Sequence, residues 1–177
     1  MQERIVSTQI SYHIGLTHQL LEITNKILSK NLNDNTWIKK LLDWGNKHIT
    51  KDSATFPKTE NEVLESRKIS LRWNRLVNIP EELCNLKHLK VLELNNNNIT
   101  DLPAEIAMLE NLEELNLNIN NLIKLPKEIT LLKNLKILNI KNNKYLELSN
   151  KQISWLENLV TNGTLVKYDK YKFKLGD

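Results

Sequence analysis

The apolar positions of residues 66–148 recur in a frame of 23 residues. In each frame two leucines or isoleucines stand two residues apart, and further apolar residues follow before a proline. The pairs are Ile69 and Leu71, Leu92 and Leu94, Leu115 and Leu117, and Leu138 and Ile140. A period of two places each pair on one face of a short strand. A fixed repeat of this length is typical of a solenoid, so we expect stacked coils that share a parallel sheet.

Two other residue types keep the same interval. Asparagines follow each predicted strand, where the backbone loses its sheet partners and a short amide can replace them; they are Asn74, Asn97, Asn120 and Asn143. Prolines precede each predicted convex helix, whose first position suits them; they are Pro57, Pro80, Pro103 and Pro126. The pattern predicts repeats near 66–88, 89–111, 112–134 and 135–157, the first and last being degenerate.

The sequences on either side of the repeats predict caps. Residues 2–30 have apolar residues at helical spacing, which favours one long amphipathic helix. A second helix is expected from Asp34 or Thr36 to Gly45, and Thr59 to Glu62 has the form of a capping box. After the repeats, residues 164–175 have the character of a strand, with a bend at Asp169-Lys170. We expect a helical cap fused to the solenoid over residues 1–58, repeats over 59–148, and a cap with a helix and a strand over 149–177.

Residues 89–134 follow the pattern Leu-x-x-Leu-x-Leu-x-x-Asn-x-Leu-x-x-Leu-Pro-x-x-Ile-x-x-Leu almost without exception. In this they resemble the leucine-rich repeat family, in the form found in intracellular Ras-associated repeat proteins and many small bacterial repeat proteins. The likeness extends more weakly over 66–148. It implies the α/β class, as a curved parallel sheet with short convex helices, and a concave face that binds proteins. The resemblance by itself implies no chemistry.

Composition narrows the function further. The formal charge is +4 and the pI about 9.0, but the lysines and arginines are spread along the chain, so electrostatic steering is weak. No segment is apolar enough to span a membrane, and the first residues do not form a secretory signal. Cys84 is the single cysteine, which allows no internal disulfide and fits a reducing compartment. We therefore expect a cytoplasmic protein.

Catalytic and metal-binding patterns are lacking in the sequence. The four histidines fall in unrelated contexts, and none pairs by motif with Cys84 or a serine; they are His13, His18, His48 and His88. His13 and His18 are five residues apart, which is not the spacing of a helical metal pair. Four glycines form no phosphate-binding loop. We therefore expect no enzyme, cofactor, metal or small-molecule substrate.

The strand register identifies a candidate binding face. Its residues are at outward strand positions and in the turns that follow: Arg72, Trp73, Arg75, Glu93, Asn95, Glu114, Asn116, Asn118, Ile119, Asn139 and Lys141. Trp73 stands out because it lies between two arginines, and Trp and Arg are frequent interface anchors. The alternative is that Trp73 packs against the N-terminal cap. We expect a non-catalytic adaptor, regulator or effector-like module that binds an unidentified protein on this face.

Two other functions stay open at this stage. Basic C-terminal residues could bind nucleic acid or an anionic surface, although the scattered charge opposes this; they are Lys141, Lys144, Lys167, Lys170, Lys172 and Lys174. The chain could also be a structural subunit that dimerises through the first helix or the edge of the solenoid. The sequence does not decide between a monomer and a homodimer.

Overall fold

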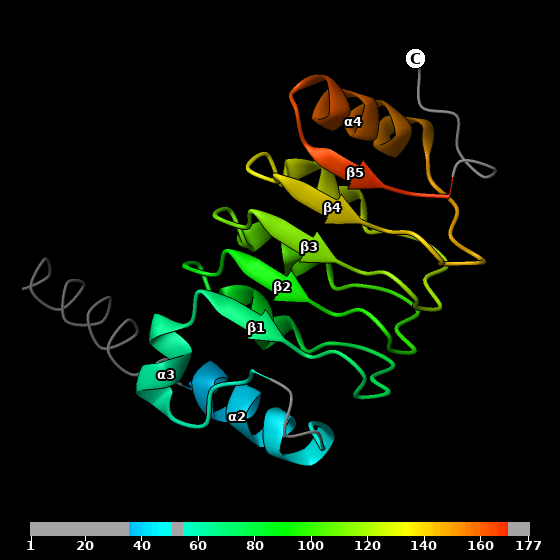
Figure 1. Cartoon of the computed structure of the whole chain (residues 1–177). Helices are drawn as coiled ribbons and strands as arrows, with labels where there is room; N and C mark the ends of the chain where they lie inside the picture. Colours follow the sequence, from blue (N-terminus) through cyan, green and yellow to red (C-terminus); the bar gives the residue numbers. More distant parts are fainter. Residues whose placement is uncertain (1–35, 51–54, 170–177) are drawn as a thin grey trace, which may run out of the picture. The chain divides into compact units, whose positions relative to one another are not determined.

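The computed structural model describes residues 36–50 and 55–169 (Figure 1). The chain divides into two compact units, Met1–Thr36 and Trp37–Asp177, and the description below concerns the second. The helix expected over residues 2–30 lies outside the described residues. The division into a cap over 1–58, repeats over 59–148 and a cap over 149–177 stays a prediction.

A parallel sheet with its strands in chain order forms one side of this unit, as the repeat predicted. The five strands of the described residues are β1 Lys68–Ser70, β2 Val91–Glu93, β3 Glu114–Asn116, β4 Ile137–Asn139 and β5 Leu165–Lys167. Neighbouring strands pair so that Ile69 lies beside Leu92, and Leu92 beside Leu115. Because the coils are equally long, their inward leucines and isoleucines stack and are almost fully buried. This column of side chains is the core predicted from the period of two.

Three short 3-10 helices lie behind the sheet in Figure 1: η1 Glu81–Asn85, η2 Ala104–Met108 and η3 Lys127–Leu131. The sequence predicted a proline at the first position of each helix. Instead Pro80, Pro103 and Pro126 precede the helices in extended conformation, with ψ near 147°. The fixed φ of proline suits this conformation equally well. Each coil thus has room for a single tight turn on its convex side.

The helix α2, Thr36–His48, covers the N-terminal end of the core. Its residues Ile38 and Leu41 are fully buried, as predicted. The predicted end at Gly45 is wrong, because the helix continues to His48. Gly45 is needed for packing instead: a Cβ added there would lie 2.1 Å from a ring carbon of Phe56.

The short helix α3, Glu60–Glu65, begins as the sequence predicted, but with half of a capping box. The Thr59 side chain accepts a hydrogen bond from the Glu62 N–H. The Glu62 carboxylate accepts from the Lys58 N–H rather than from that of Thr59. The helix therefore keeps its N-cap, while Glu62 fixes the residue before it.

A longer helix, α4 Asn150–Thr161, closes the C-terminal end. Ser149 stands where the frame has a proline, and it forms a complete capping box with Gln152. Gln152 also donates a hydrogen bond to the Leu125 carbonyl, which ties the helix to the preceding coil. β5 then pairs in parallel with β4, so the C-terminal strand continues the repeat sheet. Lys170, where half of the predicted bend falls, and residues 171–177 lie outside the described residues.

Candidate binding face

The buried asparagines hold the turn that follows each strand. Asn97 accepts hydrogen bonds from the N–H groups of Asn74 and Leu76, at 3.0 and 3.1 Å. Its amide donates to the carbonyls of Leu71 and Leu94, at 2.8 and 2.9 Å. Asn120 and Asn143 make corresponding bonds one and two coils later. The sequence predicted a structural role for these asparagines, and Asn97, Asn120 and Asn143 each link two coils.

Each turn has a left-handed residue at the position before the buried asparagine, and the first turn has a second one at Arg75, with a φ of 58°. The φ angles are 64° at Trp73, 60° at Asn96, 53° at Ile119 and 59° at Asn142. Asparagine adopts this conformation readily, whereas a large or β-branched side chain does so at a cost of about 1–3 kcal/mol. Strain of this kind concentrates at functional positions. Trp73, Arg75 and Ile119 are therefore the strained residues of these turns for which a function is expected.

These two side chains point into solvent. Trp73 is 58% exposed and Ile119 is 46% exposed. The described part of the N-terminal cap thus leaves most of the Trp73 ring uncovered, and the alternative in which the ring packs there is not supported. Arg72 and Arg75 on either side of Trp73 are also exposed. The structure brings the three residues together at the end of β1, as the sequence predicted.

Ion pairs between the coils of β1 and β2 hold the Arg72 side chain in place. Glu93 accepts from Lys68 at 3.1 Å and lies 3.5 Å from the Arg72 guanidinium. Burial raises the pKa of Glu93, but hydrogen bonds from Ser70 and Lys68 and the charges of Lys68 and Arg72 outweigh it, so the pKa is lower than usual. Ser70 stands at the outward position between the inward Ile69 and Leu71, yet it is buried. Its hydroxyl accepts a hydrogen bond from Arg72 Nε at 3.1 Å, and its backbone pairs with Thr55 in antiparallel fashion.

The middle of the face consists of half-buried polar side chains. The exposed cation Lys141 lies beyond them, after β4. Asn118 accepts a hydrogen bond from the Asn142 amide at 2.9 Å. The side-chain amide oxygens of Asn95 and Asn96 are buried, and no donor among the described residues reaches them. The remaining predicted residues keep their outward places: Glu114, Asn116 and Asn139 are half-buried, and Lys141 is exposed. None of the eleven predicted residues is buried, and their role in binding stays a prediction.

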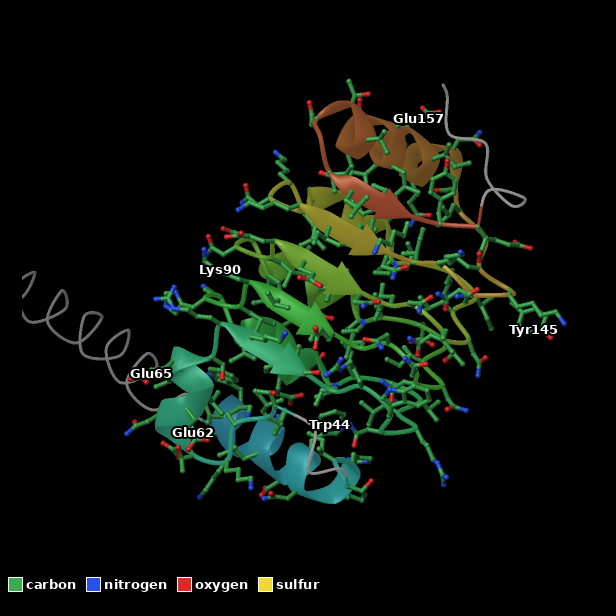
Figure 2. The ribbon with its side chains drawn as sticks, viewed as in Figure 1. Trp44, Glu62, Glu65, Lys90, Tyr145 and Glu157 are labelled. Atoms are coloured by element: carbon green, nitrogen blue, oxygen red, sulfur yellow. The ribbon has the colours of Figure 1, made fainter. Side chains whose placement is uncertain are left out.

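The sequence reasoning missed an open groove of about 550 Å³ at the turn edge. It is lined by Thr100, Asn121, Ile123, Lys144, Tyr145 and Glu147. Figure 2 shows Tyr145 projecting from this edge, in the loop after β4. The signal was available, because Tyr145 occupies the frame position of the buried Leu122, and Leu146 is buried in its place. The one-residue slip exposes an aromatic ring beside Lys144, whose ammonium lies 5.2 Å from the ring centre.

The thiol of Cys84 is not activated in this structure. Burial, with a smaller contribution from Glu105, raises the pKa of the Cys84 thiol to about 12. A thiol with such a pKa is not a nucleophile at neutral pH. The described residues contain no cluster of three His, Cys, Asp or Glu side chains that could hold a metal ion. None of the described helices has the length and apolar composition needed to cross a membrane.

An ion-pair network lies at the N-terminal ends of β2, β3 and β4, and a pH titration can test it. Glu113 accepts hydrogen bonds from Lys136 at 2.5 Å and Lys90 at 2.6 Å. Figure 2 labels Lys90, which lies on the edge away from Tyr145. The two hydrogen bonds, with that of Lys136 the larger cause, lower the pKa of Glu113 from 4.5 to about 2.

We expect a carbon-detected NMR titration of the Glu113 carboxyl to show this low pKa. Because the folded pKa is lower than the unfolded one, the stabilisation from Glu113 is present above pH 4.5 and is lost as the pH falls toward 2. In the double variant Lys90→Met, Lys136→Met the pKa should return toward 4.5. The same titration midpoint in the variant and the parent would contradict the pairing.

The fold and this face define a class: a solenoid of short parallel strands with one face of its sheet left open. A family model described as a leucine-rich repeat region matches residues 67–172, which is more than half of the chain. The chain belongs to the leucine-rich repeat family. Such domains generally mediate protein–protein interactions and are typically non-catalytic scaffolds.

A solved structure supports the assignment. The chain resembles the leucine-rich repeat protein LIC12759 of Leptospira interrogans, with 32% sequence identity and a TM-score of 0.51. The match covers 65% of this chain and 28% of the other, so this chain spans much less than two thirds of that relative. The relative is bacterial, in line with the predicted resemblance to bacterial repeat proteins. No curated protein matches the sequence.

Proposed function

We propose that this chain is a non-catalytic interaction module that binds a protein partner on the open face of its sheet. The observation that carries the proposal is Trp73, a large apolar side chain held in a left-handed turn, 58% exposed and placed between Arg72 and Arg75. Tryptophan and arginine are the residues that contribute most often to binding energy at interfaces. The strain at Trp73 is readily understood if a partner covers the ring.

The rest of the face supplies the surroundings of that anchor. Half-buried polar side chains extend from it across β2, β3 and β4, and they are suited to the hydrogen bonds that surround an anchor in an interface. The inert thiol of Cys84 favours a binding role over catalysis, with no small-molecule substrate or cofactor. A single cysteine kept as a free thiol also supports the cytoplasm as the place of action.

The triple variant Arg72→Ala, Trp73→Ala, Arg75→Ala tests the proposal. We expect it to lose at least about tenfold in partner capture, since one interface anchor is worth about 2 kcal/mol or more. The partner would first be identified by affinity purification with the parent chain from the native cell, followed by mass spectrometry. Capture by parent and variant would then be compared by pull-down.

A matched control comes from the convex side. Leu131 is 57% exposed, close to the value for Trp73, and Lys127 and Lys133 near it are exposed cations. The triple variant Lys127→Ala, Leu131→Ala, Lys133→Ala therefore removes a similar apolar and basic surface. It should capture the partner as the parent does, and both variants should keep the parent circular dichroism spectrum. Equal capture by all three proteins would place the interface elsewhere.

A further inference from the structure

Two rows of side chains lie beyond the carboxyl ends of the strands, and both rows have the same sequence of basic and amide side chains. Backbone hydrogen bonds join each turn to the next, so residues 23 apart lie side by side. Across the first four coils each row runs basic, asparagine, asparagine, basic. The rows are Arg72, Asn95, Asn118 and Lys141, and Arg75, Asn98, Asn121 and Lys144. We call these eight residues the polar rows.

The two basic ends of the rows are separated by three strand spacings. Parallel strands lie about 4.8 Å apart, so the ends are about 14 Å from each other. An extended peptide rises about 3.3 Å per residue and covers that distance in about four residues. Two acidic side chains about four positions apart on one extended segment would therefore reach both basic ends together. At the arginine end the contact falls to Arg75, because Arg72 lies 3.5 Å from the Glu93 carboxylate.

The middle of the rows offers unused hydrogen-bond acceptors. The side-chain amide oxygens (Oδ1) of Asn95 and Asn96 are buried without a donor among the described residues, which is unfavourable. Rotation of either amide about its last side-chain bond would present the oxygen to an N–H group of a bound segment. An extended backbone supplies such donors at regular intervals. The centre of the rows thus favours a peptide backbone as the occupant.

Apolar surface lies close to the lysine end. Ile119 is 46% exposed between the two rows. Ile123 and Tyr145 line the groove of about 550 Å³ that also includes Lys144. An apolar side chain placed in this groove would lie next to a carboxylate bound by Lys144. The surface is therefore suited to an apolar residue adjacent to one of the two acidic residues.

We propose that the polar rows bind an extended, acidic protein segment, with two acidic residues about four positions apart and an apolar residue next to the one at the lysine end. This rests on the proposed function, because it gives the chemistry of the partner that the open face binds. A nucleic acid fits less well. The two basic ends lie about 14 Å apart with uncharged asparagines between them, which matches two separate carboxylates better than a backbone with a charge on every nucleotide.

The test uses the full chain and a short synthetic probe measured by fluorescence anisotropy. The probe is a labelled glycine–serine peptide with two glutamates four positions apart and a leucine after the second. At low salt it should bind at least about tenfold more tightly than the same peptide with glutamines, since charge pairs favour association. The double variant Arg75→Glu, Lys144→Glu should lose at least about tenfold in affinity for the acidic probe.

The control variant Lys87→Glu, Lys133→Glu makes the same change in net charge away from the polar rows, and it should bind like the parent. The milder pair Arg75→Gln, Lys144→Gln replaces the reversal variant if circular dichroism shows that the latter is not folded. Equal affinity for the two peptides, equal loss in the control, or tighter binding of a single-stranded oligonucleotide would overturn the inference. Loss of partner capture by the triple variant Arg72→Ala, Trp73→Ala, Arg75→Ala would then still stand, so the proposed function is tested separately.

Discussion

Asn97→Ala will lower the free energy of unfolding by about 3–5 kcal/mol, because it leaves up to three buried backbone groups without partners and each costs about 1–3 kcal/mol. The groups are the N–H of Asn74 and Leu76 and the carbonyl of Leu71, whereas the Leu94 carbonyl keeps its hydrogen bond from Asn120. The sum stays below the simple total, since rearrangement and water recover part of the loss. Domains are stable by only about 5–15 kcal/mol, so the effect is large. Urea unfolding followed by circular dichroism measures it.

The neighbouring residue provides the control for this prediction. Asn98 is exposed, and its backbone N–H donates to the Leu76 carbonyl whatever its side chain is. Asn98→Ala should therefore change the free energy of unfolding by no more than about 0.5 kcal/mol. If both variants had the same urea midpoint, the buried amide of Asn97 would not be what joins the coils.

The core and the buried asparagines could be predicted because both depend on local rules. Alternation along a strand determines which side Leu92 and Leu94 face. Equal coil lengths then place Leu92 beside Leu115 without any further information. The need for partners at the end of a strand gives Asn97 its role. A periodic sequence states these relations four times, so they can be read without a structure.

The features that could not be predicted depend on residues distant in the sequence. Gly45 follows a helical pattern and is typical of a helix end, yet it lies within α2 because the ring of Phe56 occupies the space of a side chain. Ser70 is at an outward position, yet it is buried, and Thr55 pairs with its backbone. No local pattern announces either contact. Both occur where the cap meets the first coil and the repeat no longer determines the neighbours.

The sequence predicted which residues of the candidate site face outward, but it did not predict the backbone conformation of the turns. Register alone gave the outward place of Trp73 and Ile119. The left-handed turn at both residues was not foreseen, since neither residue type favours that conformation. The groove at Tyr145 was missed for a related reason: the frame assigns position 145 to the core, and the structure buries Leu146 instead. Positions that depart from the repeat pattern are thus the ones that place distinctive side chains on the surface.

Leu115→Ala is expected to lower the free energy of unfolding by about 2–5 kcal/mol, the range for truncating a buried leucine. Leu115 is fully buried and lies in register between Leu92 and Leu138. The cavity therefore opens between three coils at once. Each coil in a solenoid contacts only its neighbours, so few other groups can move in to fill the space. Urea unfolding should show a lower midpoint for the variant.

A leucine of the same coil separates this effect from a general effect of truncation. Leu131 belongs to η3 and is 57% exposed. Leu131→Ala removes the same atoms but opens no cavity, so its free energy of unfolding should stay within about 0.5 kcal/mol of the parent. A comparable loss in the two variants would mean that the convex side contributes to the core as much as the stacked strands do. A large loss confined to Leu115→Ala shows that cohesion between coils lies in the stacked column, and the strained turns at the open face then depend on that column for their support.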